Sequence, residues 1–218
     1  MRAFVIGNGY SLAKTNLELL QNDITFACNR ISKIYDTTDW RPTHYVRAEE
    51  AGIQSPDTYR EDFEIHKDCE IWANPYFFEF IDKKKGHLIR ACPHYLDNFD
   101  EDTCPTQWHL PHYCSFGSTV NVAIQIAVTL GYGPIYLIGC DLGYKDNEPS
   151  HFTDEYEKGL TGLRPARYAN MNTFMAHVNA VRSSPVPIFN ATIGGELEVY
   201  ERVDYDGLFE APTNYCMG

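Results

Sequence analysis

The apolar positions in the first third of the chain fall into short runs that polar or mixed segments separate. Short apolar runs bounded by turn residues are typical of buried strands. The leucines of the segment 12–20 indicate a short helix after the first run. Strands that alternate with helical segments predict βαβ units and a parallel sheet. The four predicted strands lie at 2–6, 24–28, 44–47 and 70–73.

The second half of the chain repeats this alternation. Residues 118–130 are apolar almost all round, which predicts a helix packed on more than one side. A buried strand is expected at 135–139, a helix at 166–182 and a last strand at 186–189, after which the chain turns into 196–203. The polar exceptions in the first of these helices form one stripe at spacings of three and four, and they are Ser118, Asn121, Gln125 and Thr129.

Two segments lack this pattern. Residues 86–117 contain three prolines among His, Cys and Tyr residues, and we expect little regular structure there. Residues 142–165 are polar and rich in glycine. A connection this long is usually a lid or a binding loop. We therefore predict one α/β domain over 1–218, with a mostly parallel sheet and a lid loop near 142–165.

Composition narrows the classes of partner. A chain of 218 residues that is 44% hydrophobic can build the core of one domain. Its net charge of −12 argues against a nucleic-acid surface, which needs clustered Lys and Arg, and against anionic lipid. An anionic small ligand stays open, because a few cations and backbone N–H groups can bind phosphate.

The apolar runs and the cysteines indicate in which cellular compartment the protein is expected. Gly7 ends the first apolar run too early for a secretory signal, and no run is long enough for a membrane span. The seven cysteines are widely spaced and include no C-x-x-C pair, which favours reduced, mostly buried thiols. We expect a cytoplasmic protein.

A glycine-rich turn after the first strand is the first candidate site. It reads Gly7-Asn8-Gly9-Tyr10-Ser11 and leads into the predicted helix. Glycines let a backbone approach a ligand closely, and a helix N-terminus presents free N–H groups to phosphate. The turn lacks the third glycine of a dinucleotide fingerprint and is not a P-loop. Both nucleotide binding and a plain turn capped by Ser11 therefore remain open.

Two more candidates stand at strand ends. Asn29 and Arg30 follow the second strand, and Asp141 follows the strand at 135–139. Ligands of parallel sheets bind beyond the C-terminal strand ends. Asn can hydrogen-bond a base or ribose, Arg can pair with phosphate, and Asp can bind a ribose hydroxyl or a metal. A turn Asn, a surface Arg and a capping Asp are the alternative interpretations.

The predicted lid supplies a candidate catalytic residue, His151. A histidine can act as base toward a sugar hydroxyl or as acid toward a leaving phosphate, although most lone loop histidines do neither. Nearby cations could bind a diphosphate or simply be solvated; they are Lys145, Lys158, Arg164 and Arg167.

A second cluster of chemistry-bearing residues lies between 92 and 114. Zinc takes four Cys or His ligands, but no pair here has finger spacing, so buried thiols and loop histidines are the simpler interpretation. The cluster comprises Cys92, His94, Cys104, His109, His112 and Cys114. The acidic pair Asp154-Glu155 could instead hold Mg²⁺ with a nucleotide.

Four segments in their order along the chain resemble the MptE-like domain of unknown function 115, a family with a pterin pyrophosphokinase branch and flagellin-modifying motility accessory proteins. The first three are also similar to bacterial sialyltransferases of glycosyltransferase family 42. Tyr10 and Arg30 depart from that pattern, where the sialyltransferases have proline and glutamine. The middle third of the chain is unmatched. The four segments are Phe4–Leu12, Ala27–Arg30, Leu130–Asp141 and Asn190–Glu198.

The resemblance implies a Rossmann-like fold that binds a CMP-sugar donor without a metal or another cofactor. By position, it also implies that a small polar residue before the buried helix contacts the nucleotide. His151 is the analogue of a catalytic histidine that lies later in the sialyltransferase lid. Tyr144 stands one residue from a tyrosine that helps the phosphate leave. The residues expected to bind the nucleotide are Gly7, Asn8, Gly9, Ser11, Asn29, Arg30, Ser118, Thr119 and Asp141.

The sequence thus favours transfer of a sugar from a nucleotide-activated donor, a CMP-nonulosonate, to a glycan or sugar acceptor, with His151 as base and no metal. One alternative is Mg²⁺-dependent pyrophosphoryl transfer from ATP to a pterin, with Asp141 as the first metal ligand. The other is a nucleotide-binding protein without catalysis. No nucleic acid or membrane span is expected, and a homo-oligomer stays open.

Overall fold

The computed structural model describes residues 1–48, 59–82, 84–91, 108–113, 118–146, 150–158 and 166–210, without the side chains of 166–169 and 172. Its strands are β1 (Ala3–Ile6), β2 (Ile24–Cys28), β3 (His44–Arg47), β4 (Glu70–Ala73), β5 (Gly86–Leu88), β6 (Arg90–Ala91), β7 (His112–Tyr113), β8 (Ile135–Ile138), β9 (Ile188–Asn190) and β10 (Glu201–Arg202). Eight of them form one sheet in the order β10-β9-β8-β1-β2-β3-β4-β5, and every neighbouring pair is parallel. The short β6 and β7 pair separately.

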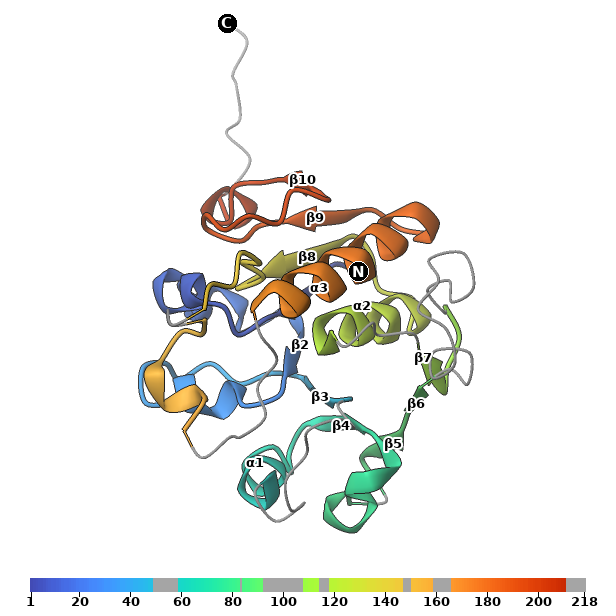
Figure 1. Cartoon of the computed structure of the whole chain (residues 1–218). Coiled ribbons are helices and arrows are strands. Elements are labelled where there is room, and N and C mark those ends of the chain that lie inside the picture. The colour runs from blue at the N-terminus through green and yellow to red at the C-terminus, as the bar shows by residue number, and fades with distance from the viewer. Residues whose placement is uncertain are drawn as a thin grey trace, which may run out of the picture.

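Helices cover the two faces of the sheet differently. The α-helices are α1 (Arg60–Ile65), α2 (Thr119–Thr129) and α3 (Ala166–Ser183), and the 3₁₀ helices are η1 (Tyr10–Lys14), η2 (Leu17–Leu20), η3 (Ile31–Ile34), η5 (Pro75–Phe80), η7 (Asp154–Tyr156) and η8 (Asp206–Leu208). Figure 1 shows α2 and α3 together on one side of the sheet, where α2 packs against the central strands. Among the described residues, none of the helices combines the length and the hydropathy that crossing a bilayer requires.

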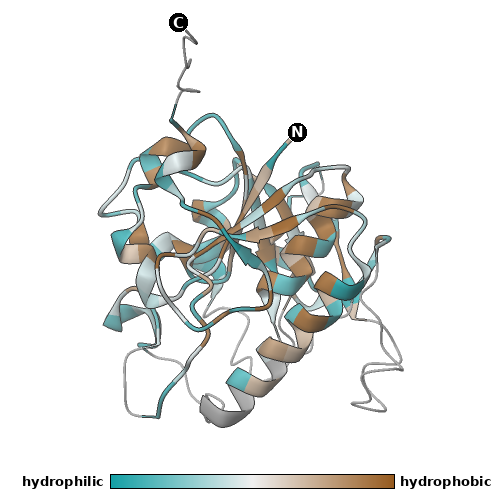
Figure 2. Ribbon diagram, turned by 90° about the horizontal axis from the view of Figure 1, so that it is seen from above, coloured by the Kyte–Doolittle hydropathy of each residue, from teal (hydrophilic) through white to brown (hydrophobic). Residues whose placement is uncertain are grey.

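The core lies on both faces of the sheet, because successive strand residues point to opposite sides. In β1, Ala3 and Val5 pack toward α2, whereas Phe4 and Ile6 pack toward the layer of 3₁₀ helices and α1. Figure 2 shows the hydrophobic colour gathered in the central strands and the helices beside them. This two-sided burial explains why the strands read as continuous apolar runs rather than as alternating ones.

The chain order creates a switch point between β1 and β8. From β1 the chain proceeds through β2 to β5 on one side, and it later returns to β8 and continues to β10 on the other. Ile6 lies opposite both Ala27 and Ile138, so the C-terminal ends of β1, β2 and β8 coincide. Such a switch point is where open α/β sheets bind ligands.

The predicted α/β class and the Rossmann-like parallel sheet are confirmed. The strands at 44–47 and 70–73 have the expected bounds, and the helix expected at 118–130 is α2. Ser118 caps α2, since its side chain accepts a hydrogen bond from the Asn121 N–H at 3.3 Å. The predicted polar stripe of α2 does not face solvent, because Asn121 and Gln125 are fully buried.

One local prediction is wrong. The segment 12–20 is not one helix but parts of η1 and η2, because Thr15 and Asn16 between them have extended backbones and the Asn16 side chain caps η2. Residues 86–117 have little regular structure in their described part, as expected, where the elements are the short strands β5, β6 and β7. β5 is a strand because it pairs with β4, and its three residues, Gly-His-Leu, are too few to show a hydrophobic pattern that would predict it.

Candidate functional site

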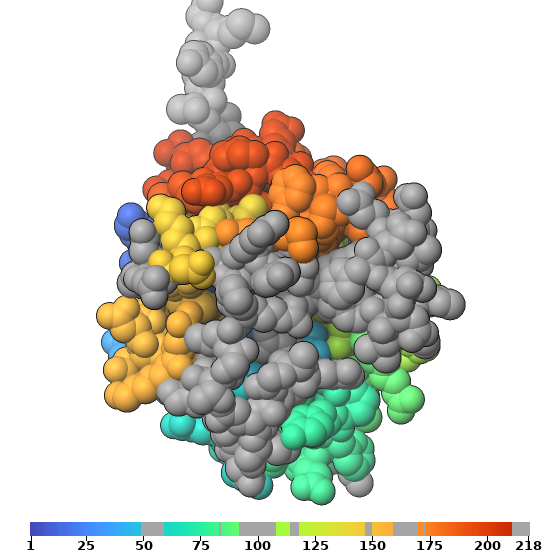
Figure 3. All heavy atoms as spheres, in the orientation of Figure 1, coloured from blue at the N-terminus to red at the C-terminus, as the bar shows by residue number. Residues whose placement is uncertain are grey.

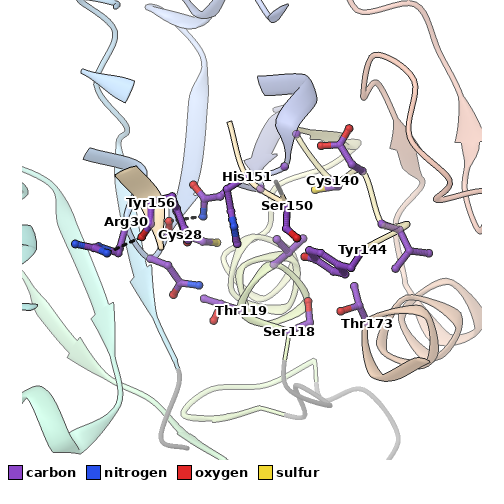
Figure 4. Close-up of a pocket in the computed structure, with 18 of the residues that line it drawn as sticks. Cys28, Arg30, Ser118, Thr119, Cys140, Tyr144, Ser150, His151, Tyr156 and Thr173 are labelled. Carbon is purple, nitrogen blue, oxygen red and sulfur yellow. Dashed lines mark hydrogen bonds between the residues drawn. The ribbon is translucent and has the colours of Figure 1, made fainter. Parts of the chain in front are cut away.

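A pocket of about 200 Å³ lies at the switch point, beyond the C-terminal ends of β1, β2, β3 and β8. The N-terminus of α2, one side of α3 and the segment 150–158 complete its walls (Figure 4). All the predicted site residues except Ser11 line it. Its lining includes Gly7, Asn8, Gly9, Asn29, Arg30, Ser118, Thr119, Asp141, Tyr144 and His151.

The two glycines of the first turn allow the turn to pack against the end of β8. A Cβ on Gly7 would lie 2.4 Å from the Gly139 carbonyl oxygen, and one on Gly9 would lie 1.7 Å from Asp141 Oδ2. The N–H groups of Gly7 and Gly9 donate to the carbonyls of Ile138 and Gly139. The space beside these two glycines is therefore filled by the end of β8, and their N–H groups are already hydrogen-bonded. Neither the space nor these N–H groups are left for the phosphate that the sequence had predicted there.

Asp141 joins the same turn. Its Oδ2 accepts a hydrogen bond from the Ser11 N–H at 3.2 Å, and the residue is 4% exposed. Burial raises the pKa of Asp141 above its usual value, and hydrogen bonds from Ser11 oppose this. Since η1 has only five residues and its Ser11 N–H is bonded, the expected helix N-terminus for phosphate does not form here.

Asn8 and Asn29 each carry a buried amide oxygen without a hydrogen-bond partner among the described residues. Asn8 Nδ2 donates to the Cys28 carbonyl at 2.9 Å, which ties the ends of β1 and β2 together. Asn29 has a positive φ of 53°, a conformation that Asn tolerates better than most residues. Both residues line the pocket, and an amide oxygen pairs with donors such as ribose hydroxyls or amino groups.

The Arg30 guanidinium is bonded to the segment 150–158. Its Nη1 donates to the carbonyls of Tyr156 at 2.5 Å and Lys158 at 3.0 Å. The Phe152 N–H donates to the Asn8 carbonyl at 3.2 Å, so the segment is attached to the ends of both β1 and β2. These contacts make Arg30 a support of the pocket wall as well as a lining residue.

The N-terminus of α2 faces the pocket through Ser118 and Thr119 (Figure 4). Thr119 is 5% exposed, and its hydroxyl has no hydrogen-bond partner among the described residues. The first N–H groups of a helix have no partner within the helix, and the helix dipole favours an anion there. This end of α2, rather than η1, offers the pocket's helix N-terminus.

His151 lies against its own segment. Its Nδ1 is 2.8 Å from Glu157 Oε1, and its ring stacks on Tyr156 at 3.8 Å between centroids. Burial lowers the pKa of His151 below its ordinary value, while Glu157 acts in the opposite direction. The imidazole is therefore neutral at neutral pH, which is the form a general base needs.

Tyr144 lies on the other side of the pocket, where Asn170 of α3 holds its backbone. Asn170 Oδ1 accepts from the Tyr144 N–H at 2.7 Å, and Asn170 Nδ2 donates to the Tyr144 carbonyl at 2.8 Å. Figure 4 shows the Tyr144 ring near Ser118 and Thr173. In Figure 3 the segment around Tyr144 (yellow) lies between α3 (orange) and the segment 150–158 (amber).

The structure adds pocket residues that the sequence did not single out. Arg47 ends β3, is 2% exposed, and lies with its guanidinium 3.8 Å from the Tyr59 ring centroid. Its place at a strand end is the signal that identified Asn29 and could have identified Arg47. His177 of α3 is buried, hydrogen-bonded at 2.8 Å to Tyr200, and burial lowers its pKa to about 4. Nothing in the sequence marks it.

No group of three or more metal-ligating side chains occurs within the described ranges. Of the six proposed zinc ligands, only His109 and His112 fall within these ranges, and the other four lie outside them. The sequence also contains two D-x-D triplets, whose paired carboxylates could hold a metal ion. The triplet at 100–102 lies outside the described ranges, and the one at 204–206 does not line the pocket. Asp141 is the pocket's one carboxylate among its described lining residues.

Fold and site together define an α/β protein with a ligand pocket at the switch point of a parallel sheet. No family model matches the chain, and no curated protein sequence does, so membership of the MptE-like family stays a prediction. Two solved structures have a similar fold. The MAf glycosyltransferase from Magnetospirillum magneticum AMB-1 has a TM-score of 0.57 and 15% identity over 93% of this chain.

The second is the sialyltransferase CST-II in complex with CMP, with a TM-score of 0.56 and 16% identity over 92% of this chain and 85% of that one. This chain covers 33% of the MAf glycosyltransferase, about a third of its length. At these identities the likeness shows the fold alone.

Proposed function

We propose that this protein transfers a sugar from a nucleotide-activated donor, a CMP-nonulosonate, to a hydroxyl of a glycan or sugar acceptor. The proposal is carried by four residues that line one pocket with His151 and that each hold a buried polar atom without a partner among the described residues. Asn8, Asn29 and Thr119 contribute a buried oxygen each, and Asp141 contributes its Oδ1. The fold of the two glycosyltransferases, one of them solved with CMP, supports the same class of reaction.

The unpartnered oxygens favour a nucleoside. Amide and carboxylate oxygens only accept hydrogen bonds, so the ligand has to bring hydroxyl or amino donors, as a ribose and a cytosine amino group do. Leaving such a buried acceptor unpaired costs about 1–3 kcal/mol, and a ligand that donates a hydrogen bond to it removes this cost. The N-terminus of α2, with Ser118 and Thr119, suits the phosphate.

The proposed reaction uses His151 as general base. Nε2 removes the proton from the acceptor hydroxyl as its oxygen attacks the anomeric carbon of the donor. The bond between that carbon and the phosphate oxygen breaks, and CMP leaves with the electron pair. Tyr144 is proposed to donate a hydrogen bond to the departing phosphate, and the reaction as proposed needs no metal ion. Loss of such a donor typically costs about 10²–10³-fold in rate.

Nucleotide binding tests the site. Titration calorimetry with CMP, ADP, GDP and ATP, each with and without Mg²⁺, should show CMP binding that is indifferent to the metal. Asn29→Gly removes the amide while keeping the backbone conformation, and it should weaken CMP binding about tenfold, the value of one hydrogen bond. Asn16→Gly, at an exposed cap outside the pocket, is the matched control.

Binding of ATP alone, and only with Mg²⁺, would replace the proposal with pyrophosphoryl transfer. If no nucleotide binds, both enzyme classes fail.

Turnover tests the chemistry. CMP release from a CMP-nonulosonate in the presence of a glycan acceptor should fall by about 10²–10⁴-fold in His151→Ala, as expected for a general base. His87→Ala is the control, because His87 pairs with Glu70 at 2.8 Å but does not line the pocket. CMP binding without turnover of any activated sugar would indicate a nucleotide-binding protein without catalysis.

A further inference from the structure

The His151 imidazole is held on two sides by neighbouring residues of its own segment. Glu157 Oε1 lies 2.8 Å from Nδ1, and the Tyr156 ring is stacked at 3.8 Å with an interplanar angle of 10°. The His151 side chain is 18% exposed and that of Glu157 is 41% exposed. The histidine is thus sheltered, and the carboxylate that reaches it comes from the solvent side.

This contact determines where the imidazole proton lies. An ionised carboxylate can only accept, so the hydrogen of the pair has to sit on His151 Nδ1. In a neutral imidazole the other nitrogen, Nε2, then keeps its lone pair. A base needs that lone pair available to the acceptor hydroxyl, whereas the opposite tautomer would present an N–H instead.

The segment that carries the pair is itself fixed to the strand ends. Arg30 donates to the carbonyls of Tyr156 and Lys158, on either side of Glu157. Phe152, next to His151, donates its N–H to the Asn8 carbonyl. The position of the pair is therefore defined relative to the ends of β1 and β2, where the nucleotide is proposed to bind.

The other charged or titratable groups of the pocket do not provide this contact. Arg30, Arg47, Asp141 and His177 line the same pocket, each from a different element. The described hydrogen bonds of the His151 ring run to Glu157 alone. Glu157 is thus the group whose removal would free the ring nitrogen.

We propose that Glu157 is the positioning residue for His151, holding it as the Nδ1–H tautomer so that Nε2 accepts the proton of the attacking hydroxyl. Tyr156 fixes the plane of the ring. This inference rests on the proposed role of His151 as base. Glu157 touches no substrate in this scheme and acts only through the imidazole.

Nitrogen-15 NMR of the histidine rings in the free protein tests the tautomer without any need for turnover. The His151 signals are identified by their loss in His151→Gln. The wild type should show the Nδ1–H form, Glu157→Ala should shift His151 toward the Nε2–H form, and Glu157→Gln, which keeps an accepting oxygen, should restore much of the wild-type pattern. Glu70→Ala, at the matched pair outside the pocket, should leave His151 unchanged.

Turnover should follow the tautomer. Glu157→Ala should lower kcat by about 10–100-fold and change the KM for the donor by less than about threefold, since substrate binding is left intact. A wild-type tautomer in Glu157→Ala overturns the proposal. So does an unchanged kcat in Glu157→Ala when His151→Ala is inactive. Equal turnover of wild type and His151→Ala would instead refute the assignment of His151 as the base. The NMR measurement of the tautomer does not depend on that assignment.

Discussion

At the scale of single residues, the sequence predicted which positions meet but not always what they do there. Gly9 has a φ of −66°, which any residue can adopt, so this glycine is required for space. The carboxylate of Asp141 fills that space. Arg30, expected to pair with phosphate, also donates through Nη1 to carbonyls of residues far along the chain. Long-range contacts of this kind leave no periodic pattern, so the sequence alone could not show them.

Gly9→Ala should destabilise the protein by about 1–3 kcal/mol, the cost of overpacking a site that cannot move freely. The added Cβ meets Asp141 Oδ2, which is already bonded to the Ser11 N–H. Urea unfolding measures the change. The double variant Gly9→Ala/Asp141→Ala should be more stable than the sum of the single changes predicts, because removing the carboxylate relieves the closest part of the clash and leaves the Gly139 carbonyl oxygen at 2.8 Å.

Gly131→Ala is the control for backbone strain, because Gly131 has a φ of 84° and open space around it. Strict additivity of the Gly9 and Asp141 changes would contradict the packing explanation.

At the scale of elements, the long helix α2 and the buried strands were predicted well, and the short helical segments were not. The apolar run of α2 fixes its bounds, and Ser118 marks its start. The segment 12–20 has helical spacing of leucines, yet Asn16 bonds to the Glu18 N–H and divides it into η1 and η2. Side-chain competition for backbone groups decides such short segments, and periodicity does not report it.

Ser118 serves both as a helix cap and as a pocket residue, and two substitutions separate these roles. Ser118→Ala should lower the free energy of unfolding by about 1 kcal/mol, since the cap is lost. Ser118→Asp keeps a capping oxygen and should preserve stability, but its charge should repel a phosphate and weaken CMP binding by about tenfold or more. Urea unfolding and calorimetry measure the two effects.

A Ser118→Asp variant that binds CMP as tightly as wild type would show that the phosphate does not approach α2.

At the scale of the whole molecule, composition and apolar runs sufficed to predict a parallel α/β sheet. They did not predict which helices cover the face opposite α2, because η3, α1 and η5 are short, and α1 and η5 hold aromatic residues rather than a regular stripe. The structure also buries histidines throughout this fold. Burial lowers the pKa of His44, His66 and His177 to about 4 each.

These shifts predict a loss of stability in mild acid. The unfolded chain takes up protons on these histidines below about pH 6.5, while the folded chain resists until about pH 4. The free energy of unfolding should therefore be highest above about pH 6.5 and should fall as the pH drops from about 6.5 to about 4. The fall is about 3 kcal/mol for His177 alone. Urea titrations from pH 7.5 to about pH 4.5 measure it.

The raised pKa values of Asp62 and Asp141 act in the opposite direction, so the His177 contribution is read as a difference between proteins. His177→Asn keeps a polar group opposite Tyr200 and should flatten the pH dependence relative to wild type. Identical slopes for the two proteins would contradict the assignment.

The central place of β1 has a consequence for how the protein is made. Ala3 pairs with Ile24 on one side but with Ile135 on the other, so the second neighbour of β1 is synthesised long after the first. Until then a nascent chain exposes one edge of its most buried strand, an edge that invites pairing with other chains. Slow elongation through the middle third should therefore favour aggregation, and a chaperone that shields this edge should raise the yield of folded protein.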